Sequence, residues 1–413
     1  MNRLNANRRR FLAGSLTASA GLAIGGAMPG PWMHALANKV AGGSDRILIV
    51  IQLSGGNDGL NTVIPYADEA YQRARPKLAI PISDVRKFDD RVGLHPSLGG
   101  VEKMLESGRF SIVQGVGYSA PNRSHFESMD IWHSCHRKAE RGTEGWLGRW
   151  IAAQSTAMPG DSLGLHLGSD QQPLALAGRG VQVPSIASIE RFRLKVADDG
   201  LVDQSEIETR DAGNAADATG GELLGFLSAS TAAAADASAR IEKALETPDA
   251  AGDFPDTQLG EKLRVISRLI VAGLSTKVYY VTLDGFDTHS QQPQAHAALL
   301  RQWSDALESL VRRLEQAGQA DRVLVMTFSE FGRRVAENAS DGTDHGAAAP
   351  MFLSGPRLPK AVFGDFPSLT DLEDGDLKFT TDFRSVYATV IEKWFQTASQ
   401  PILGEAFPTI DVI

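Results

Sequence analysis

The sequence predicts a layered α/β fold in which helices cover both faces of a mostly parallel central sheet. Short runs rich in β-branched residues recur along the chain. They lack the strict alternation of apolar and polar residues that marks a sheet with one face in water. Segments with apolar residues at helical spacing separate these runs. Such alternation of strands and helices is typical of α/β domains.

Five segments are expected to form strands of this sheet, and they cover residues 46–53, 110–115, 277–283, 322–328 and 350–353. Three segments are expected to form helices, at residues 259–270, 294–318 and 383–394. The Ala-rich stretch 204–254 fits neither class. It is interpreted as a helical insertion or cap on a single α/β domain that covers residues 38–413.

The first 37 residues have the features of a twin-arginine export signal. Arg8-Arg9-Arg10 precedes a mildly apolar stretch of small residues, and Ala35-Leu36-Ala37 offers a cleavage site. We therefore expect the twin-arginine export machinery to deliver the folded chain to the periplasm or another exported location. No stable membrane span is expected after signal removal, because the apolar stretch is short and interrupted.

The composition is that of an acidic globular protein. Its net charge of −9 becomes −13 without residues 1–37, which carry four arginines and no acidic residue. Such a charge disfavours nucleic acid and anionic membrane surfaces as partners, so neither is expected. Cys135 is the only cysteine, and no intrachain disulfide can form.

Carboxylates and imidazoles gather at the ends of the predicted strands. In mostly parallel sheets, ligands bind beyond the carboxyl ends of the strands. Oxygen and nitrogen donors in this mixture suit a divalent metal ion such as Zn²⁺, Mn²⁺, Mg²⁺ or Ca²⁺, and we expect one such ion, or two. The candidate ligands are Asp58, Asp284, Asp287, His289, Glu330 and His345.

Taken singly, each candidate ligand also has a purely structural interpretation. The three aspartates lie in turn-forming sequences, and the two histidines could be hydrogen-bonded residues of a loop or helix start. Glu330 could form an ion pair with Arg333 or Arg334. The agreement of four separate segments favours the metal interpretation.

The stretch Ser124-His125-Phe126-Glu127 follows the second predicted strand and has two interpretations. Ser-x-x-Glu before an apolar run is a capping box, which alone would explain both residues. A serine at a helix N-terminus also lies beside backbone N–H groups that favour an anion, as a nucleophile attacking a phosphate or sulfate requires. Ser124 is therefore a candidate nucleophile, and Arg123 is a candidate anion-binding residue.

Several blocks of the sequence resemble the exported proteins grouped as domain of unknown function 1501. The resemblance covers nearly the whole chain after the signal. The blocks are LSGGNDGLNTVIPY (53–66), NRSHFESMDIW (122–132), GFDTHSQQ (285–292), TFSEFGR (327–333), DHGAAAPMFL (344–353) and TDFRSVYATVIEKWF (381–395). That family looks like a distant branch of the alkaline phosphatase and sulfatase superfamily. The resemblance therefore implies a three-layer α/β/α sandwich, alkaline phosphatase/sulfatase-like, with a site for one or two metal ions.

Carried over to this sequence, the resemblance places Ser124 where the superfamily has its nucleophile. Glu330 stands where the superfamily usually has Asp-His, which implies that one metal position loses an imidazole. The metal residues that match the superfamily in type are Asp58, Asp287, His289 and His345.

Two functions remain open at this point. The first is an exported metal-dependent hydrolase that acts on a phosphate or sulfate ester, with a small-molecule or polysaccharide substrate. In it, Ser124 or a water attacks while Arg123 stabilises charge on the ester oxygens. The second is a non-catalytic binding or assembly protein of the same fold with a degenerate metal site. The substitution at Glu330 favours the second, and the survival of the other candidate ligands favours the first.

Overall fold

The computed structural model describes residues 45–137, 142–154, 162–168, 171–186, 241, 243 and 254–413. The predicted signal at residues 1–37 and almost all of the predicted insertion at 204–254 lie outside these ranges. Both stay predictions. In the described ranges, no helix is long and apolar enough to cross a membrane.

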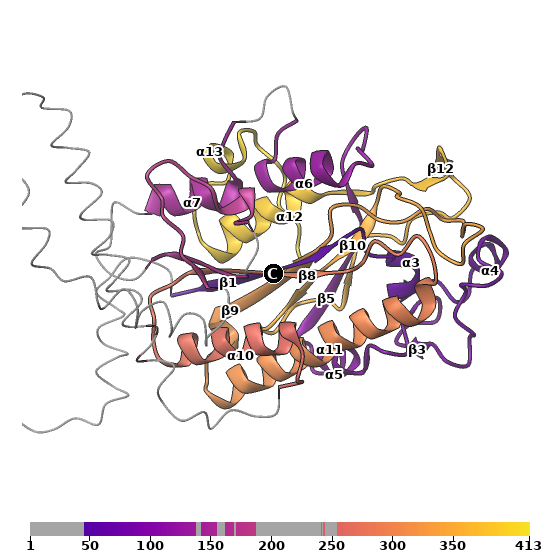
Figure 1. Ribbon diagram of the computed structural model, residues 1–413, viewed down its shortest axis with the longest axis horizontal. Coiled ribbons are helices and arrows are strands. Elements are labelled where there is room, and N and C mark those ends of the chain that lie inside the picture. The colour runs from indigo at the N-terminus through magenta and orange to yellow at the C-terminus, as the bar shows by residue number, and fades with distance from the viewer. Residues whose placement is uncertain are drawn as a thin grey trace, which may run out of the picture. The chain divides into compact units, whose positions relative to one another are not determined.

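The described part of the chain is built around a nine-stranded sheet (Figure 1). In spatial order its strands are β11 (Val362–Phe363), β5 (Phe110–Gly117), β10 (Ala349–Ser354), β9 (Val323–Phe328), β1 (Ile47–Ser54), β8 (Val278–Asp284), β6 (Gly164–Leu167) and β7 (Ser185–Ile186), and β14 (Thr381–Asp382) also pairs with β5. Neighbouring strands of this sheet pair in parallel, except that β10 runs antiparallel to β5 and β9.

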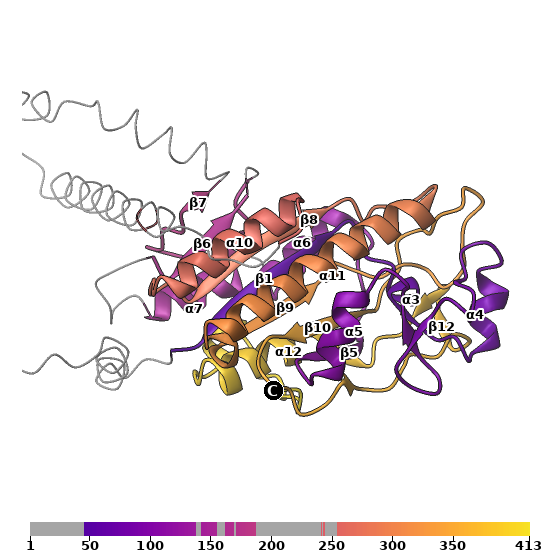
Figure 2. The same ribbon diagram turned by 90° about the horizontal axis from the view of Figure 1, so that it is seen from below.

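Helices cover both faces of the sheet (Figures 1 and 2). On one face lie α5 (Gly99–Glu106), α10 (Gln258–Val271) and α11 (Gln292–Gln316). On the other lie α6 (His125–Ser134), α7 (Trp146–Gln154), α12 (Phe383–Thr389), its π-helical continuation η4 (Val390–Trp394) and α13 (Gln400–Leu403). The predicted α/β fold with a mostly parallel central sheet is therefore confirmed.

Strand β1 explains why the strand sequences lack alternation. Its odd-numbered residues, such as Ile49, pack in the cluster under α10 and α11, while Leu48 and Val50 pack in the cluster under α6 and α12. Both kinds of position are therefore apolar. Burial of each side chain stabilises the fold by about 1.5–3 kcal/mol.

The five predicted strands correspond to β1, β5, β8, β9 and β10, with ends shifted by two residues at most. The smaller elements of the described chain are α3 (Gly59–Thr62), β2 (Val63–Ile64), α4 (Glu69–Ala74), β3 (Arg86–Lys87), β4 (Gly93–Leu94), η1 (Leu174–Leu176), η3 (Ala320–Arg322), β12 (Leu372–Glu373) and β13 (Asp376–Leu377).

The direction of β10 decides where the candidate site lies. Strands β1, β5, β8 and β9 run in parallel, so their carboxyl ends meet at one edge of the sheet. Because β10 is antiparallel to its neighbours, the residues before it lie at this same edge. His345 therefore comes next to residues that follow the other strands.

Candidate metal centre

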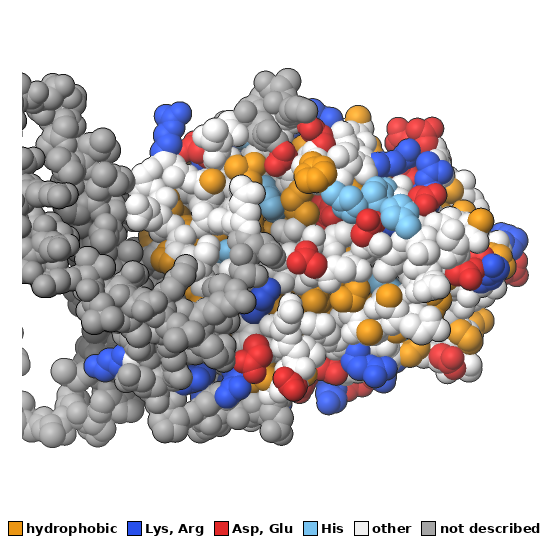
Figure 3. All heavy atoms as spheres, viewed as in Figure 1, with side chains coloured by type: hydrophobic (Ala, Val, Ile, Leu, Met, Phe, Trp, Pro, Cys, Tyr) orange, Lys and Arg blue, Asp and Glu red, His pale blue; other side chains and the backbone are white. Residues whose placement is uncertain are grey.

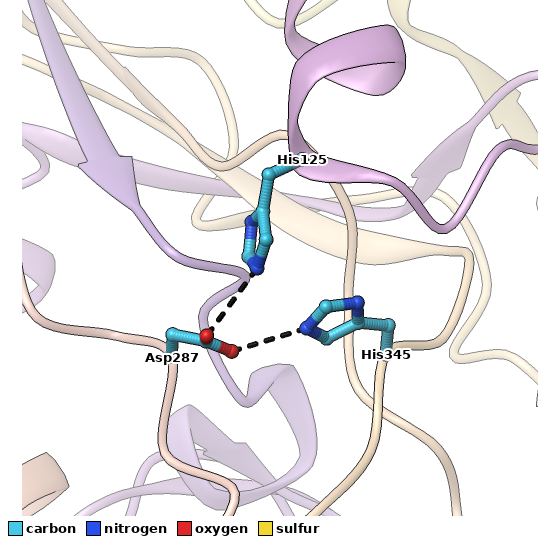
Figure 4. Close-up of side chains that lie close together, drawn as sticks. All are labelled: His125, Asp287 and His345. Carbon is cyan, nitrogen blue, oxygen red and sulfur yellow. Dashed lines mark hydrogen bonds and ion pairs between the residues drawn. The ribbon is translucent and has the colours of Figure 1, made fainter.

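Three histidines and one aspartate converge at this edge of the sheet. His125 begins α6 after β5, Asp287 and His289 follow β8, and His345 precedes β10. The Asp287 Oδ2 atom lies 3.4 Å from His125 Nε2. The Asp287 Oδ1 atom lies 3.1 Å from the Nε2 atoms of both His289 and His345. Figure 4 shows His125 and His345 both pointing at Asp287, from two different directions.

Solutes can reach this group. Histidine side chains form a patch on the face seen in Figure 3. The side chains of His125, His289 and His345 are 32%, 44% and 20% exposed. The group is therefore open to an ion and a substrate.

In each histidine, the nitrogen that faces away from Asp287 is held by a hydrogen-bond acceptor. His125 Nδ1 lies 2.9 Å from Glu330 Oε1. His289 Nδ1 lies 3.2 Å from Asp344 Oδ1, and His345 Nδ1 lies 2.7 Å from the backbone carbonyl oxygen of Arg123. A carbonyl oxygen or a carboxylate can only accept, so each Nδ1 carries a proton.

The consequence is that unprotonated nitrogens face one another. A neutral imidazole has one N–H, so with Nδ1 protonated Nε2 presents a lone pair. His345 Nε2 also lies within hydrogen-bond distance of Asp287 Oδ1, at 3.1 Å, and can donate to that carboxylate only when it carries a proton itself. The Nε2 atoms of His289 and His345 are 2.9 Å apart. His125 Nε2 is buried and has no hydrogen-bond partner. Lone pairs that converge on a carboxylate repel one another unless a cation or added protons lie among them.

The donor set fits a divalent metal ion. His125, Asp287 and His345 each offer a ligand atom within 4.8 Å of the other two, and His289 lies beside them as a fourth donor. Zinc bonds of about 2.0–2.1 Å to nitrogen and oxygen place neighbouring ligands of a tetrahedron roughly 3.3 Å apart. The distances of 3.1–3.4 Å from Asp287 to the three imidazoles, and of 2.9 Å between His289 and His345, are close to this value. Three imidazoles and one carboxylate favour Zn²⁺.

The electrostatics of the group favour an ionised Asp287. Partial burial opposes its ionisation, but the hydrogen bond from Arg333, with that from His345 Nε2 when this nitrogen carries a proton, outweighs burial and lowers the pKa of Asp287 to about 2. For His125, the hydrogen bond to Glu330 is the largest effect and raises the pKa of the imidazole. The carboxylate is thus charged at neutral pH, and protons compete with a metal ion for His125.

Glu330, predicted as a ligand, lies behind His125 rather than within the group. It is fully buried and accepts a second hydrogen bond from the backbone N–H of Gly55 at 2.8 Å. Its described partners do not include Arg333 or Arg334. Its position is that of a carboxylate that orients a metal-binding histidine.

Asp58, also predicted as a ligand, is 1% exposed and lies in a separate polar network. Its Oδ2 atom accepts hydrogen bonds from Arg75 at 2.6 Å and from Gln292 at 2.5 Å. Burial raises the pKa of Asp58, but the Arg75 charge and hydrogen bonds outweigh it, so the pKa is lowered. Asp284 ends β8 and is exposed. The structure places neither aspartate in the histidine group, and a ligand role for them stays a prediction.

Ser124 occupies the N-cap position of α6, but its side chain makes no capping hydrogen bond. The exposed hydroxyl lies next to His125 in the sequence. The Arg123 side chain donates to the Asp376 carboxylate at 2.7 Å. It lines a cleft of about 670 Å³, together with Asn122 and residues near β13. The nucleophile and anion-binding roles stay predictions.

His125 was not among the residues predicted from the sequence. The resemblance implied that Glu330 leaves the centre one imidazole short. The structure brings the imidazole of His125, from another segment, to the same group, and Glu330 lies within hydrogen-bond distance of it. One feature of the sequence could have identified His125 as a candidate ligand: it follows a predicted strand and its loop, just as His289 does.

The chain belongs to the family described as Protein of unknown function (DUF1501), whose model matches residues 45–402. This confirms the family resemblance seen in the sequence. A search of the curated proteins found no significant match.

Solved structures with a similar fold have low sequence identity. One is a protein in the alkaline phosphatase superfamily from Vibrio parahaemolyticus (8% identity, TM-score 0.40, 88% of this chain and 69% of that chain). Another is the C-terminal periplasmic domain of EcEptC from Escherichia coli in complex with Zn (8%, 0.38, 77% and 74%). A third is the PsFucS1 sulfatase from Pseudoalteromonas sp. (10%, 0.37, 92% and 72%). At these TM-scores, no statement about activity rests on the likeness.

Proposed function

We propose that this chain is an exported, metal-dependent hydrolase that acts on a phosphate or sulfate ester. One observation carries the proposal. Three imidazoles, each with Nδ1 held by an acceptor, direct Nε2 toward a single ionised carboxylate on an exposed face. Such a group is typical of a metal centre, because orienting acceptors behind the ligands fix the ring and the tautomer.

In this proposal, His125, Asp287, His289 and His345 hold one divalent ion, with zinc favoured by the donor types. When bound, the ion supplies Lewis-acid polarisation of an ester oxygen. Glu330 and Asp344 keep His125 and His289 in the required tautomer.

Ser124 is the proposed nucleophile. Its hydroxyl is exposed at the start of the ten-residue helix α6 and is not used for capping. The Oγ atom forms a bond to phosphorus or sulfur as the bond to the leaving oxygen breaks. The serine proton passes to solvent, and the departing alkoxide takes a proton from solvent to leave as the alcohol. Water then cleaves the seryl ester, which releases phosphate or sulfate and restores the hydroxyl. The helix N-terminus favours the negative charge of the transferred group.

Arg123, which is ion-paired with Asp376, would bind the transferred anion of the substrate. Together with Lys378, it lines a cleft whose lining does not include Ser124 itself. The cleft also contains acidic residues, so we place only the transferred anion near Arg123. Polar or uncharged parts of the substrate would occupy the remaining volume.

A binding or assembly protein with a structural ion remains the second candidate. The observation that favours it is Asp58, which Arg75 neutralises in the interior, so the predicted ligand set is not assembled as a whole. The two functions differ in one respect. In the non-catalytic protein there is no turnover, and removal of the ion lowers stability only, whereas removal of a catalytic ion abolishes turnover.

The test combines metal content with turnover. Protein purified from the exported fraction is expected to contain one equivalent of metal and to hydrolyse an aryl phosphate or aryl sulfate. His345→Ala should lose both properties, whereas Ser124→Ala should keep the metal and lose about 100-fold or more in turnover. His136→Ala is the matched control, because His136 is bonded to Ser134 away from the group. A metal-loaded protein without turnover would favour the binding function, and a metal-free wild type would refute the centre.

A further inference from the structure

We propose that Arg333 is a positioning residue that holds the ligand-bearing loops in register, an inference that rests on the metal centre of the proposed function. Its side chain is fully buried, so it cannot touch a substrate. Nothing in the sequence singled it out except as a partner for Glu330. Its described contacts join three loops that reach the edge of the sheet from different strands.

The guanidinium has five acceptors. Nε donates to the Gly56 carbonyl at 2.7 Å, and Nη1 donates to the Thr343 carbonyl at 2.7 Å. Nη2 donates to the Phe286 carbonyl at 2.9 Å, to Asp287 Oδ1 at 2.7 Å and to the Gly55 carbonyl. These acceptors come from the loops after β1 and β8 and from the loop before β10.

Three of the four proposed metal ligands depend on one of these contacts. Asp287 accepts a hydrogen bond from Arg333 directly. His345 is two residues from Thr343, and its backbone also pairs with that of Arg333. His125 is reached through Gly55, whose N–H donates to the carboxylate of Glu330 that holds the imidazole. One buried cation thus fixes the separation between ligands that are far apart in the sequence.

Two glycines allow the loops to approach the guanidinium. Gly55 and Gly56 have φ of +117° and +80°, in the region that favours glycine. A Cβ atom at Gly55 would lie 2.3 Å from the backbone nitrogen of Asp287, and one at Gly56 would lie 2.4 Å from the Phe331 ring and 3.2 Å from Arg333 Nε. The loop is therefore shaped to present its carbonyls to this side chain.

Arginine is required here because its planar group has five N–H donors in a fixed fork. The ammonium of a lysine has three donors on a single atom and cannot span three loops. Arg333→Lys keeps the charge beside Asp287 and removes most of the bridging. It therefore separates a positioning role from a purely electrostatic one.

The matched control is Arg109→Lys. Arg109 is also buried and donates to a carboxylate, Asp321, and to a backbone carbonyl, that of Gly355. It precedes β5 and so lies at the opposite edge of the sheet. Both substitutions remove a buried guanidinium, but only one of them affects the candidate centre.

The experiment measures amide hydrogen exchange in metal-free wild type, Arg333→Lys and Arg109→Lys, followed by titration with zinc. We expect exchange at residues 55–57, 286–289 and 343–346 to rise at least tenfold in Arg333→Lys alone, with at least tenfold weaker zinc binding. Equal exchange at these loops in all three proteins would overturn the inference, as would equal effects of the two variants. A wild type that binds no zinc would refute the proposed function, while the exchange data would still decide the role of Arg333.

A second measurement needs no variant and applies if Arg333→Lys does not fold. In metal-free wild type, the guanidinium N–H signals of Arg333 should be individually resolved by NMR and exchange far more slowly than those of Arg123, whose side chain is 38% exposed. Rapid exchange at Arg333, equal to that at Arg123, would overturn the inference.

Discussion

Two aspartate–arginine pairs at the same edge of the sheet differ in what surrounds them. Asp58 follows β1 and pairs with Arg75, while Asp287 follows β8 and pairs with Arg333. Both arginines are fully buried, but the side chain of Asp58 is 1% exposed and that of Asp287 is 47% exposed. Asp58 accepts hydrogen bonds from the N–H groups of Arg75 and Gln292. Asp287 accepts one from Arg333 and, in addition, faces the Nε2 atoms of three histidines.

This difference shows that a carboxylate at a strand end is not enough to define a ligand. The first pair has the features of an internal ion pair, in which charge is neutralised by protein donors. The second has the features of a metal centre, in which protein donors leave nitrogen lone pairs uncompensated. The following experiments separate the two.

The largest effect on stability is expected at the internal pair. Arg75→Met leaves the Asp58 charge buried without a partner, which should lower the free energy of unfolding by about 3–5 kcal/mol. Urea unfolding of the metal-free protein measures it. Arg73→Met is the control, because the Arg73 side chain is 66% exposed and its loss should cost no more than about 0.5 kcal/mol. If Arg75→Met lost metal while keeping its stability, Asp58 would belong to the centre.

The reverse pattern is expected at the second pair. Asp287→Asn removes a ligand charge from a half-exposed position, so zinc affinity should fall about 100-fold or more. The metal-free protein should lose less stability than Arg75→Met does, because the buried Arg333 keeps its four backbone carbonyl acceptors. Calorimetric titration with zinc measures the first quantity. Asp341→Asn, at an exposed carboxylate paired with Lys77, is the control and should bind zinc like wild type. An unchanged affinity in Asp287→Asn would exclude this carboxylate from the centre.

A smaller effect on zinc affinity is expected from a change at Glu330, which lies behind His125. Glu330→Gln keeps an oxygen that can accept from His125 Nδ1 but removes the charge, so zinc affinity should fall by about tenfold. Glu337→Gln is the control, because Glu337 accepts from the backbone of Lys77 and Leu78 instead. A loss as large as that of Asp287→Asn would mean that Glu330 binds the ion itself, as the sequence suggested.

The sequence was sufficient for the fold because the physical signal is local. The apolar runs at β1 and β9 and the helical spacing in α11 follow directly from burial on both faces of a sheet. The positions of Asp287, His289 and His345 at one edge also followed, since strand ends meet there.

The sequence was insufficient where a role depends on partners far along the chain. Asp58 and Asp287 both lie in turn-forming sequences, and only folding brings Arg75 to the first and imidazoles to the second. Likewise, Glu330 and His125 are 205 residues apart, and the hydrogen bond between them could not be predicted from the local sequence of either residue. Such roles are set by tertiary hydrogen bonds rather than by local patterns.

The smallest expected effect is a shift in pH dependence, and it sharpens the distinction between Glu330 and a direct ligand. The hydrogen bond to Glu330 raises the pKa of His125, while burial and Arg333 oppose this and Asp287 supports it. The His125 imidazolium therefore stabilises the metal-free fold at pH values below the unfolded-state pKa, which is near 6.5, and this contribution is lost as pH rises through the raised pKa of the folded state.

Because zinc must displace the proton of this imidazolium, the affinity for zinc should fall as pH is lowered through the same range. In Glu330→Gln the cause of the raised pKa is weakened, so the fall should begin at lower pH. Zinc titrations between pH 5 and 8, at about half-unit steps, measure both curves. Coincident midpoints in wild type and Glu330→Gln would show that the His125–Glu330 pair does not control binding of the ion.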